Sequence, residues 1–304
     1  MSLLISDSSV VPEPGAATAW GRLIGASASL AAAELASCID RPVLMLAEDP
    51  RHADQLEAEI RFFAGDDLPV EHFVEWETLP WDSFSPHQDI ISQRLRVLSA
   101  LPDMKKGIVI AAASVLQQRL PPIDYVAARS LTLSEEQVLD RQDFTDSLVE
   151  AGYFRVPQVS EHGEFAVRGS LIDVFPMGAD IPIRIDFFDD EIESLRYFSS
   201  ETQLSGERTG RIDILPAREV PLDAEAVKVF RHRYRERFEG QPAKSRVYRE
   251  ISEGIAHGGI EYFLPLFFDA TASLVDYLPD DCVVLTPAAR SPLLQQFWSE
   301  ASER

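Results

Sequence analysis

Alternation of apolar and polar residues is most regular in the middle of the chain. It predicts one strand over Phe165–Phe175, which Pro176 ends, and a second strand over Ile181–Phe188. An Asp-Asp pair then turns the chain into a third predicted strand, Ile192–Phe198. A helical pattern that opens with a capping-box motif precedes them, over Ser134–Gly152. This order of elements is typical of an α+β domain.

The middle strand divides its residues into two sets, because side chains along a strand point alternately to its two faces. One set is wholly apolar and is expected in the core: Ile181, Ile183, Ile185 and Phe187. The other set is Pro182, Arg184, Asp186 and Phe188. An arginine and a phenylalanine on an exposed sheet face are typical of a protein-binding hot spot. The pattern alone favours a structural alternative, in which Arg184 pairs with Asp186 or Glu193 and Phe188 lies under a loop.

Short, wholly apolar runs flank this middle region. Pro42–Ala47 and Gly107–Ala113 alternate with helical patterns and predict buried strands of a parallel sheet. Ser85 is expected to cap the helix that lies between them. The last apolar run, Cys282–Leu285, cannot form a sheet alone, so we expect it to join the first sheet. The middle domain is then an insertion.

The fold class predicted from these patterns is α/β, a doubly wound sheet with an inserted α+β domain. Two dipeptides mark the boundaries, Pro121-Pro122 and Leu215-Pro216. We therefore expect domains at residues 1–122, 123–215 and 216–304, with the first and last completing one sheet.

Net charge limits the kinds of partner. The 304 residues carry a formal charge of −22, and this excess of carboxylate disfavours unaided binding of nucleic acid. We find no run of Lys and Arg long enough to form a basic groove. The six histidines are dispersed and no metal-ligand spacing occurs, so we expect no metal and no cofactor.

Cysteine usage and hydropathy indicate a cytoplasmic protein. Cys38 and Cys282 lie far apart in apolar contexts, which predicts buried thiols in a reducing compartment. No apolar run approaches the ~20 residues of a membrane span. Residues 1–17 lack the basic start of a signal peptide.

Five separated motifs extend over essentially the whole chain. They are Asp82–Asp89 (DSFSPHQD), Glu161–Gly169 (EHGEFAVRG), Phe175–Gly178 (FPMG), Ile185–Leu195 (IDFFDDEIESL) and Gly259–Tyr262 (GIEY). Together they resemble the N-terminal UvrB-like region of the bacterial transcription-repair coupling factor (Mfd) family and, more distantly, UvrB. The resemblance implies domains 1a, 2 and 1b of a UvrB-like module, with domain 2 inserted. In that family the polymerase-binding domain and the motor follow this region, so we expect the chain to be a fragment.

The resemblance also locates a lost nucleotide site. UvrB has a phosphate-binding loop where this chain has Leu23–Ala32. Such a loop needs glycines, a lysine for the phosphates and a hydroxyl for Mg²⁺. Aligned on the first glycine, the corresponding positions are Gly25, Ala28, Leu30, Ala31 and Ala32. The acidic pair expected after Cys282–Leu285 is Thr-Pro-Ala here. The resemblance thus implies a degenerate P-loop-NTPase-like domain with no catalytic residues and no enzyme activity.

The family's contact with UvrA aligns with Arg168, Arg184 and Phe188. The last two are the pair that strand periodicity places on the non-core face. The resemblance therefore favours the hot-spot interpretation, and implies a non-enzymatic adaptor that recruits UvrA to stalled transcription complexes in nucleotide excision repair. The segment His72–Gln93 is too short for the hairpin that UvrB inserts into DNA.

Two alternatives stay open beside the adaptor. The first is an autoinhibitory clamp, in which this region packs on the C-terminal domains of its own full-length chain. The second is a residual DNA-dependent ATPase, which the missing lysine and hydroxyl oppose. RNA polymerase and DNA are expected as partners only through regions that this segment lacks, and the segment is expected to be a monomer without membrane contact.

Overall fold

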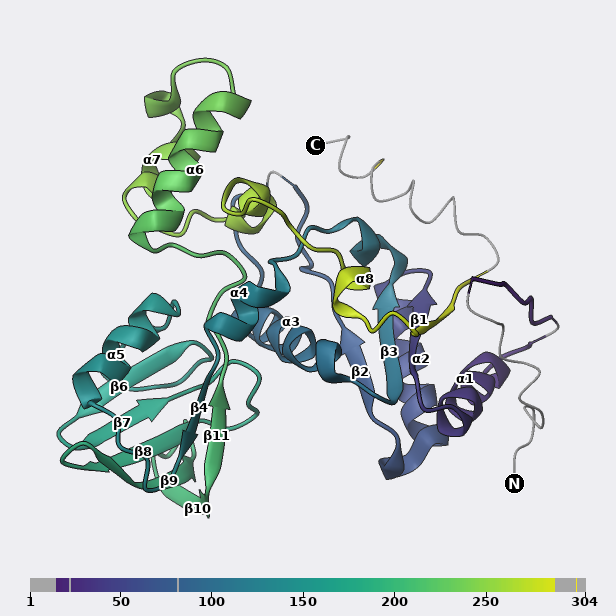
Figure 1. Ribbon diagram of the computed structural model, residues 1–304, viewed down its shortest axis with the longest axis horizontal. Coiled ribbons are helices and arrows are strands. Elements are labelled where there is room, and N and C mark those ends of the chain that lie inside the picture. Colours follow the sequence, from purple (N-terminus) through teal and green to yellow (C-terminus); the bar gives the residue numbers. More distant parts are fainter. Residues whose placement is uncertain (1–14, 22, 81, 288–298, 300–304) are drawn as a thin grey trace. The chain divides into compact units, whose positions relative to one another are not determined.

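Two units are formed by the residues that the computed structural model describes, which are 15–21, 23–80, 82–287 and 299 (Figure 1). The first unit comprises the described residues up to Glu75, Ala100–Gln118 and those from Ser273 onward. The second comprises Trp76–Ser99 and Arg119–Ala272. The chain thus leaves the first unit twice, after Glu75 and after Gln118, and returns to it at Ala100 and at Ser273.

A four-stranded parallel sheet forms the first unit, in the order β12-β1-β3-β2. The strands are β1 (Pro42–Ala47), β2 (Val70–Phe73), β3 (Gly107–Ala112) and β12 (Val283–Leu285). Every residue of β1 and β3 is buried, as in a sheet covered on both faces. Val283 of β12 pairs with Val43 of β1, so the predicted return of the last apolar run is confirmed.

Two helices, α1 (Ser27–Cys38) and α2 (Pro50–Ala64), pack their apolar residues against this sheet. Asp49 caps α2 by accepting a hydrogen bond from the backbone N–H of His52. The short helices of this unit are η2 (Gly65–Asp67), η3 (Leu101–Asp103), η4 (Ala113–Gln117) and α8 (Leu274–Tyr277). Cys38, expected to be buried, is exposed because it is the last residue of α1, and both cysteines are free.

The second unit contains a six-stranded sheet in the order β10-β9-β8-β7-β6-β5. Its strands are β5 (Phe154–Arg155), β6 (Glu164–Arg168), β7 (Leu171–Val174), β8 (Ile183–Phe188), β9 (Glu191–Phe198) and β10 (Ser205–Thr209). All neighbours are antiparallel except β5 and β6. Strands β4 (Leu131–Ser134) and β11 (Arg211–Ile214) pair separately. The chain is therefore mixed α/β, with parallel and antiparallel sheets.

The predicted single strand Phe165–Phe175 is wrong, because these residues form the hairpin of β6 and β7. Gly169, with φ of +65°, makes the turn between the two strands. The turn shifts the alternation by one residue. Phe165 faces the core in β6, whereas Ile172 and Val174 face it in β7. Asp173 is thereby placed on the opposite face.

The core of this sheet lies between its inner face and helix α5 (Arg141–Glu150), which contributes Phe144 and Leu148. Ile183, Ile185 and Phe187 are buried there, as predicted. Ile181, expected beside them, is 49% exposed because β8 begins only at Ile183.

The remaining helices of the second unit are α3 (Gln88–Ala100), α4 (Ile123–Ala128), α6 (Ala224–Arg237), η5 (Pro242–Lys244), α7 (Arg246–Ser252) and η6 (Ile260–Leu266). Helices α6, α7 and η6 share an apolar cluster of their own around Phe230. No helix within the described ranges is both long and apolar enough to cross a membrane. Those ranges also contain no group of three His, Cys, Asp or Glu side chains that could hold a metal ion.

Two of the sequence motifs meet in the second unit. Ser85 does not cap α3, which begins at Gln88. Its hydroxyl instead donates to Glu261 Oε2 at 2.9 Å and accepts from the N–H of Gly259 at 3.1 Å. A Cβ on Gly258 would lie 2.2 Å from the carbonyl oxygen of Ser83, so only glycine permits this approach. The GIEY motif therefore fixes the DSFSPHQD loop.

We predict that Glu261 makes the stability of the chain pH-dependent. Burial raises its pKa to about 7, with a smaller contribution from Glu219 and an opposing one from Arg218. A carboxyl in the unfolded chain titrates near 4.3, so the unfolded state loses its proton first and stability falls as pH rises from about 4 to 7. At about 1.36 kcal/mol per pH unit, the loss between the two pKa values amounts to about 4 kcal/mol.

Glu261→Gln should abolish this loss, since an amide can still accept from Ser85 but does not ionise. Urea unfolding of both proteins between pH 5 and pH 8, at about one-unit intervals, measures the effect. The same pH dependence in the two proteins would refute the assignment to Glu261.

Candidate protein-binding site

The outer face of the six-stranded sheet brings together the residues predicted to bind a protein. Arg168 ends β6, and Arg184 and Phe188 lie on β8. Strand pairing places four residues in a row on this face, in the order Ala166, Asp173, Arg184 and Arg196. All three predicted residues therefore lie on the face opposite the core, as periodicity and the resemblance indicated.

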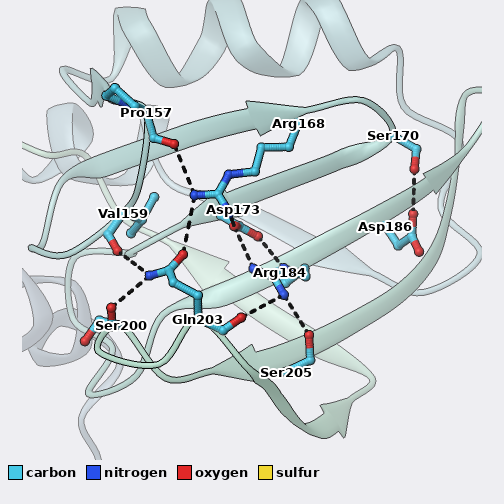
Figure 2. Close-up of polar contacts among 10 residues, drawn as sticks. All are labelled: Pro157, Val159, Arg168, Ser170, Asp173, Arg184, Asp186, Ser200, Gln203 and Ser205. Carbon is cyan, nitrogen blue, oxygen red and sulfur yellow. Dashed lines mark hydrogen bonds and ion pairs between the residues drawn. The ribbon is translucent and has the colours of Figure 1, made fainter.

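Arg184 is held by a buried carboxylate (Figure 2). Its Nε and Nη2 donate to the two oxygens of Asp173, at 2.7 Å and 2.9 Å. Asp173 is fully buried, and the Arg184 side chain is 15% exposed. The hydrogen bonds to Asp173 raise the pKa of Arg184 above its usual range. The guanidinium also lies 4.9 Å from the centre of the Phe198 ring.

The partner predicted for Arg184 is therefore wrong, although an ion pair does form. Asp173 lies directly opposite Arg184 on β7, while Asp186 is on the same strand as Arg184 and accepts from Ser170 at 3.1 Å. The prediction missed this partner because it treated Asp173 as part of an uninterrupted strand. The turn at Gly169 brings Asp173 onto the outer face.

Gln203 contacts both arginines from the turn between β9 and β10. Its backbone carbonyl accepts from Arg184 Nη1 at 3.3 Å, and its side-chain Oε1 accepts from Arg168 Nη2 at 3.5 Å. Its amide group donates to the carbonyls of Val159 and Ser200, at 3.1 Å and 2.8 Å. Gln203 has a φ of +63°, a conformation that needs support from such contacts. It thus ties the neighbouring loops to the arginine pair.

The two arginines differ in the donors that they leave open. All three nitrogen atoms of Arg184 donate to Asp173, Gln203 or Ser205. Within the described chain, Arg168 donates only through Nη2, to Gln203 and to the carbonyl of Pro157 at 3.1 Å. Its Nη1 lies 4.0 Å from Asp173, and the side chain is 38% exposed. Arg168 therefore keeps donors for an external acceptor, and Arg184 is largely used inside the chain.

Phe188 is 70% exposed and lies opposite Glu191 of β9, not under a loop. On the far side of Glu191 lies Val138, joined to it by an isolated bridge and 76% exposed. Residues that are paired across neighbouring strands point to the same face. Val138, Glu191 and Phe188 therefore form a row on the outer face, with two apolar side chains flanking one carboxylate.

Sequence reasoning missed Val138 because it placed this residue in a helix. Helix α5 begins only at Arg141, capped by Asp140. The preceding residues instead run along β9, through hydrogen bonds from Glu136 N–H to the Ile192 carbonyl and from Leu139 N–H to the Asp190 carbonyl. Leu139 packs toward the core and Val138 points away from it. The opposite orientations of the neighbouring residues Val138 and Leu139 are those of a strand, and a strand pattern in this short segment was the signal that could have identified it.

The residues of the degenerate nucleotide site lie at the start of α1 in the first unit. Gly25 is exposed with a φ of +59°, and α1 begins two residues later. Ala31 and Ala32 are buried against the parallel sheet. Ala28 and Leu30 are half-buried. Residues 15–21 and 23–26 contain no strand, whereas a P-loop joins a strand to a helix.

Comparison with known families shows what part of the second unit is similar to. The sequence model of the UvrB interaction domain matches residues 131–220, which extend from β4 to just beyond β11. The whole six-stranded sheet lies within the residues that match this model.

Over most of its length the chain matches the N-terminal region of transcription-repair-coupling factors, which confirms the resemblance seen in the motifs. It is 40% identical over 285 residues to the factor of Escherichia coli (strain K12), covering 93% of this chain and 25% of the relative. The chain is 39% identical over 285 residues to the Haemophilus influenzae factor, again covering 93% of this chain and 25% of the relative. The Mycobacterium tuberculosis factor is 36% identical over 263 residues, 80% of this chain and 21% of the relative. The chain spans about a quarter of the length of the curated relatives it matches.

We predict that Arg184→Ala destabilises the chain far more than Arg168→Ala. Removing Arg184 leaves Asp173 buried without its ion-pair partner, a defect that costs about 3–5 kcal/mol. Arg168 is partly exposed, donates hydrogen bonds only through Nη2 and has its Nη1 4.0 Å from Asp173, so its removal should cost only about 0.5–1 kcal/mol. Urea unfolding of the two variants measures both values. Equal stability of the two would show that Asp173 does not depend on Arg184.

Proposed function

We propose that this chain is a non-enzymatic adaptor that binds UvrA through the outer face of its six-stranded sheet and so recruits UvrA to stalled transcription complexes. The match to the UvrB interaction domain and the names of the relatives support a role in transcription-coupled repair with UvrA interaction. The observation that carries the proposal is the exposure of Arg168 and Phe188 on the outer face of the six-stranded sheet.

The side chains of this face have separate tasks in the proposal. Arg168 offers open guanidinium donors to a carboxylate of UvrA, in the charge-assisted geometry that arginine favours. Phe188 enters an apolar pocket of the partner, and Val138 extends the apolar contact beyond Glu191. Arg184, Asp173 and Gln203 hold the sheet and the loops in the arrangement that presents Arg168.

A second proposal, compatible with the first, is that the same face is covered in a longer chain. Two large apolar side chains, Phe188 and Val138, are exposed to solvent on either side of Glu191. The chain spans about a quarter of its relatives' length, so further domains are available as a cover. Such a contact would make this region an autoinhibitory clamp as well as an adaptor.

We further propose that the first unit is a degenerate NTPase-like domain, and that the whole chain divides in sequence into domains 1a (1–122), 2 (123–215) and 1b (216–304). Support comes from Ala31 and Ala32, which pack into the core where a P-loop requires a lysine and a hydroxyl. A residual DNA-dependent ATPase is disfavoured for the same reason. We expect the segment to act as a monomer in the cytoplasm.

Alanine substitution of the exposed residues tests the adaptor proposal. Arg168→Ala and Phe188→Ala should each cost about 2–4 kcal/mol of UvrA binding, or about 30- to 1,000-fold in affinity. Val138→Asp should also weaken binding, because it inserts a charge into the apolar contact. Calorimetry with purified UvrA measures each affinity, and thermal melting checks that the variants are folded.

Matched controls come from exposed residues elsewhere in the chain. Phe62, which is exposed on α2, and Val149, which is exposed on α5, serve for Phe188 and Val138. Arg211 on β11 serves for Arg168. Phe62→Ala, Val149→Asp and Arg211→Ala should bind UvrA as the unaltered chain does. Folded Arg168→Ala and Phe188→Ala variants with unchanged affinity would end the assignment of this face.

We predict no ATP hydrolysis and no measurable binding of Mg-ATP. The side chains that would contact phosphate and Mg²⁺ are replaced by alanines, so neither ligand finds its usual donors. Calorimetric titration with Mg-ATP is the measurement. Micromolar binding would contradict a degenerate nucleotide site.

A further inference from the structure

A strongly basic segment stands out in this acidic chain. Residues 228–249 contain eight Lys or Arg and two Asp or Glu, a local charge of +6 in a protein of −22. The segment covers most of α6, the whole of η5 and the first half of α7. Sequence inspection missed it because the cations do not form a run: apolar core residues such as Phe230 and Tyr234 separate them at helical spacing. The chain contains no long run of Lys and Arg, as its sequence indicates, but cations that are separated in sequence are gathered on one pair of helices.

Most of these cations are exposed, and five of them have no carboxylate partner in the described chain: Arg231, Arg235, Arg237, Lys244 and Arg249. Arg235 Nε donates to the hydroxyl of Tyr248 at 2.9 Å, and Arg231 lies near the same hydroxyl. Two guanidinium groups thus meet at one neutral oxygen. This arrangement brings like charges together without compensation, and an external anion would stabilise it.

The apolar cluster beneath the cations fixes their positions. Phe230 and Tyr234 of α6 pack against Tyr248 of α7, with ring centres 6.3 Å and 5.2 Å apart. The Tyr234 hydroxyl donates to Ser245, the residue that caps α7. The two helices therefore present the cations from a packed support, which reduces the entropy lost on binding.

The surface chemistry favours a phosphate backbone over a protein partner. A protein interface needs an apolar centre, yet no large apolar side chain described between Leu204 and Ile255 is exposed. Single-stranded nucleic acid needs exposed aromatic rings for base stacking, and the tyrosines of this hairpin are buried. Arginine-rich surfaces without either feature suit the phosphates of a duplex, which are contacted irrespective of sequence.

The overall charge of −22 does not oppose such a contact. At physiological ionic strength, charges separated by more than about 8 Å are largely screened from one another. A duplex at the hairpin therefore responds to the cations within its reach, and not to carboxylates on distant elements.

We propose that the α6–α7 hairpin binds the phosphate backbone of duplex DNA through Arg231, Arg235, Arg237, Lys244 and Arg249. The contact is sequence-independent and uses none of the residues of the proposed UvrA face. It gives this region a nucleic-acid contact of its own.

Fluorescence anisotropy with a short labelled DNA duplex tests the proposal on the whole chain. The unaltered chain should bind with a Kd of about 10⁻⁴–10⁻⁶ M, and log K should fall with log salt with a slope of about −0.9 for each phosphate contact. Lys244→Gln/Arg249→Gln removes two cations that make no hydrogen bond in the described chain. This variant should bind more weakly and lose about two units of slope. The double variant Arg231→Gln/Arg235→Gln should lose affinity and salt slope in the same way.

A matched control removes two exposed arginines from the six-stranded and two-stranded sheets, Arg155→Gln/Arg211→Gln. The control should keep the affinity and the salt slope of the unaltered chain. Thermal melting confirms that each variant is folded. Equal loss in the control and the hairpin variants would overturn the proposal, as would absence of binding at about 50 mM salt. Tighter binding to polyglutamate than to duplex would identify an acidic protein as the partner and also overturn it.

Discussion

The outer face of the six-stranded sheet depends on one ion pair, that between Asp173 and Arg184. A fully buried carboxylate is costly unless its oxygens are satisfied, and Arg184 satisfies both of them. Because the same guanidinium also reaches Gln203 and Ser205, the pair links β7, β8 and the β9–β10 turn. The open donors of Arg168 are available to a partner because the pair holds these neighbours in place.

The sequence predicted the elements whose patterns are local and regular. The inner residues of β8 and the return of Val283–Leu285 to the parallel sheet follow from periodicity and from the need of a strand for neighbours. Features that depend on pairing between strands were not predictable in this way. The turn at Gly169 reverses which residues face the core, and only the register shows that Asp173 meets Arg184. Val138 was missed for the same reason. The sequence around it resembles the start of a helix, and only its pairing with Glu191 of β9 shows that it is strand-like.

Polar residues with more than one possible use were also misassigned. Ser85 has the sequence context of a helix cap, but it bridges Gly259 and Glu261, more than 170 residues further along the chain. Two motifs that carry the family resemblance are thus one structural feature, and their spacing in sequence gives no sign of it. Net charge likewise gives no information about local charge. A value of −22 averages over the whole surface, while the cations of 228–249 are gathered on one packed hairpin.

The division of tasks between Arg168 and Arg184 changes how substitutions at such a face must be interpreted. Loss of binding after Arg184→Ala would follow from collapse of the Asp173 network as readily as from loss of a direct contact. Phe188 does not carry this ambiguity, and Arg168 carries less of it, because its Nη1 lies 4.0 Å from Asp173 whereas Arg184 bonds both oxygens of that carboxylate. Two surfaces of the second unit, the outer sheet face and the α6–α7 hairpin, share no residues, so charge changes on one leave the other intact. The two proposed contacts can therefore be tested independently by substitution.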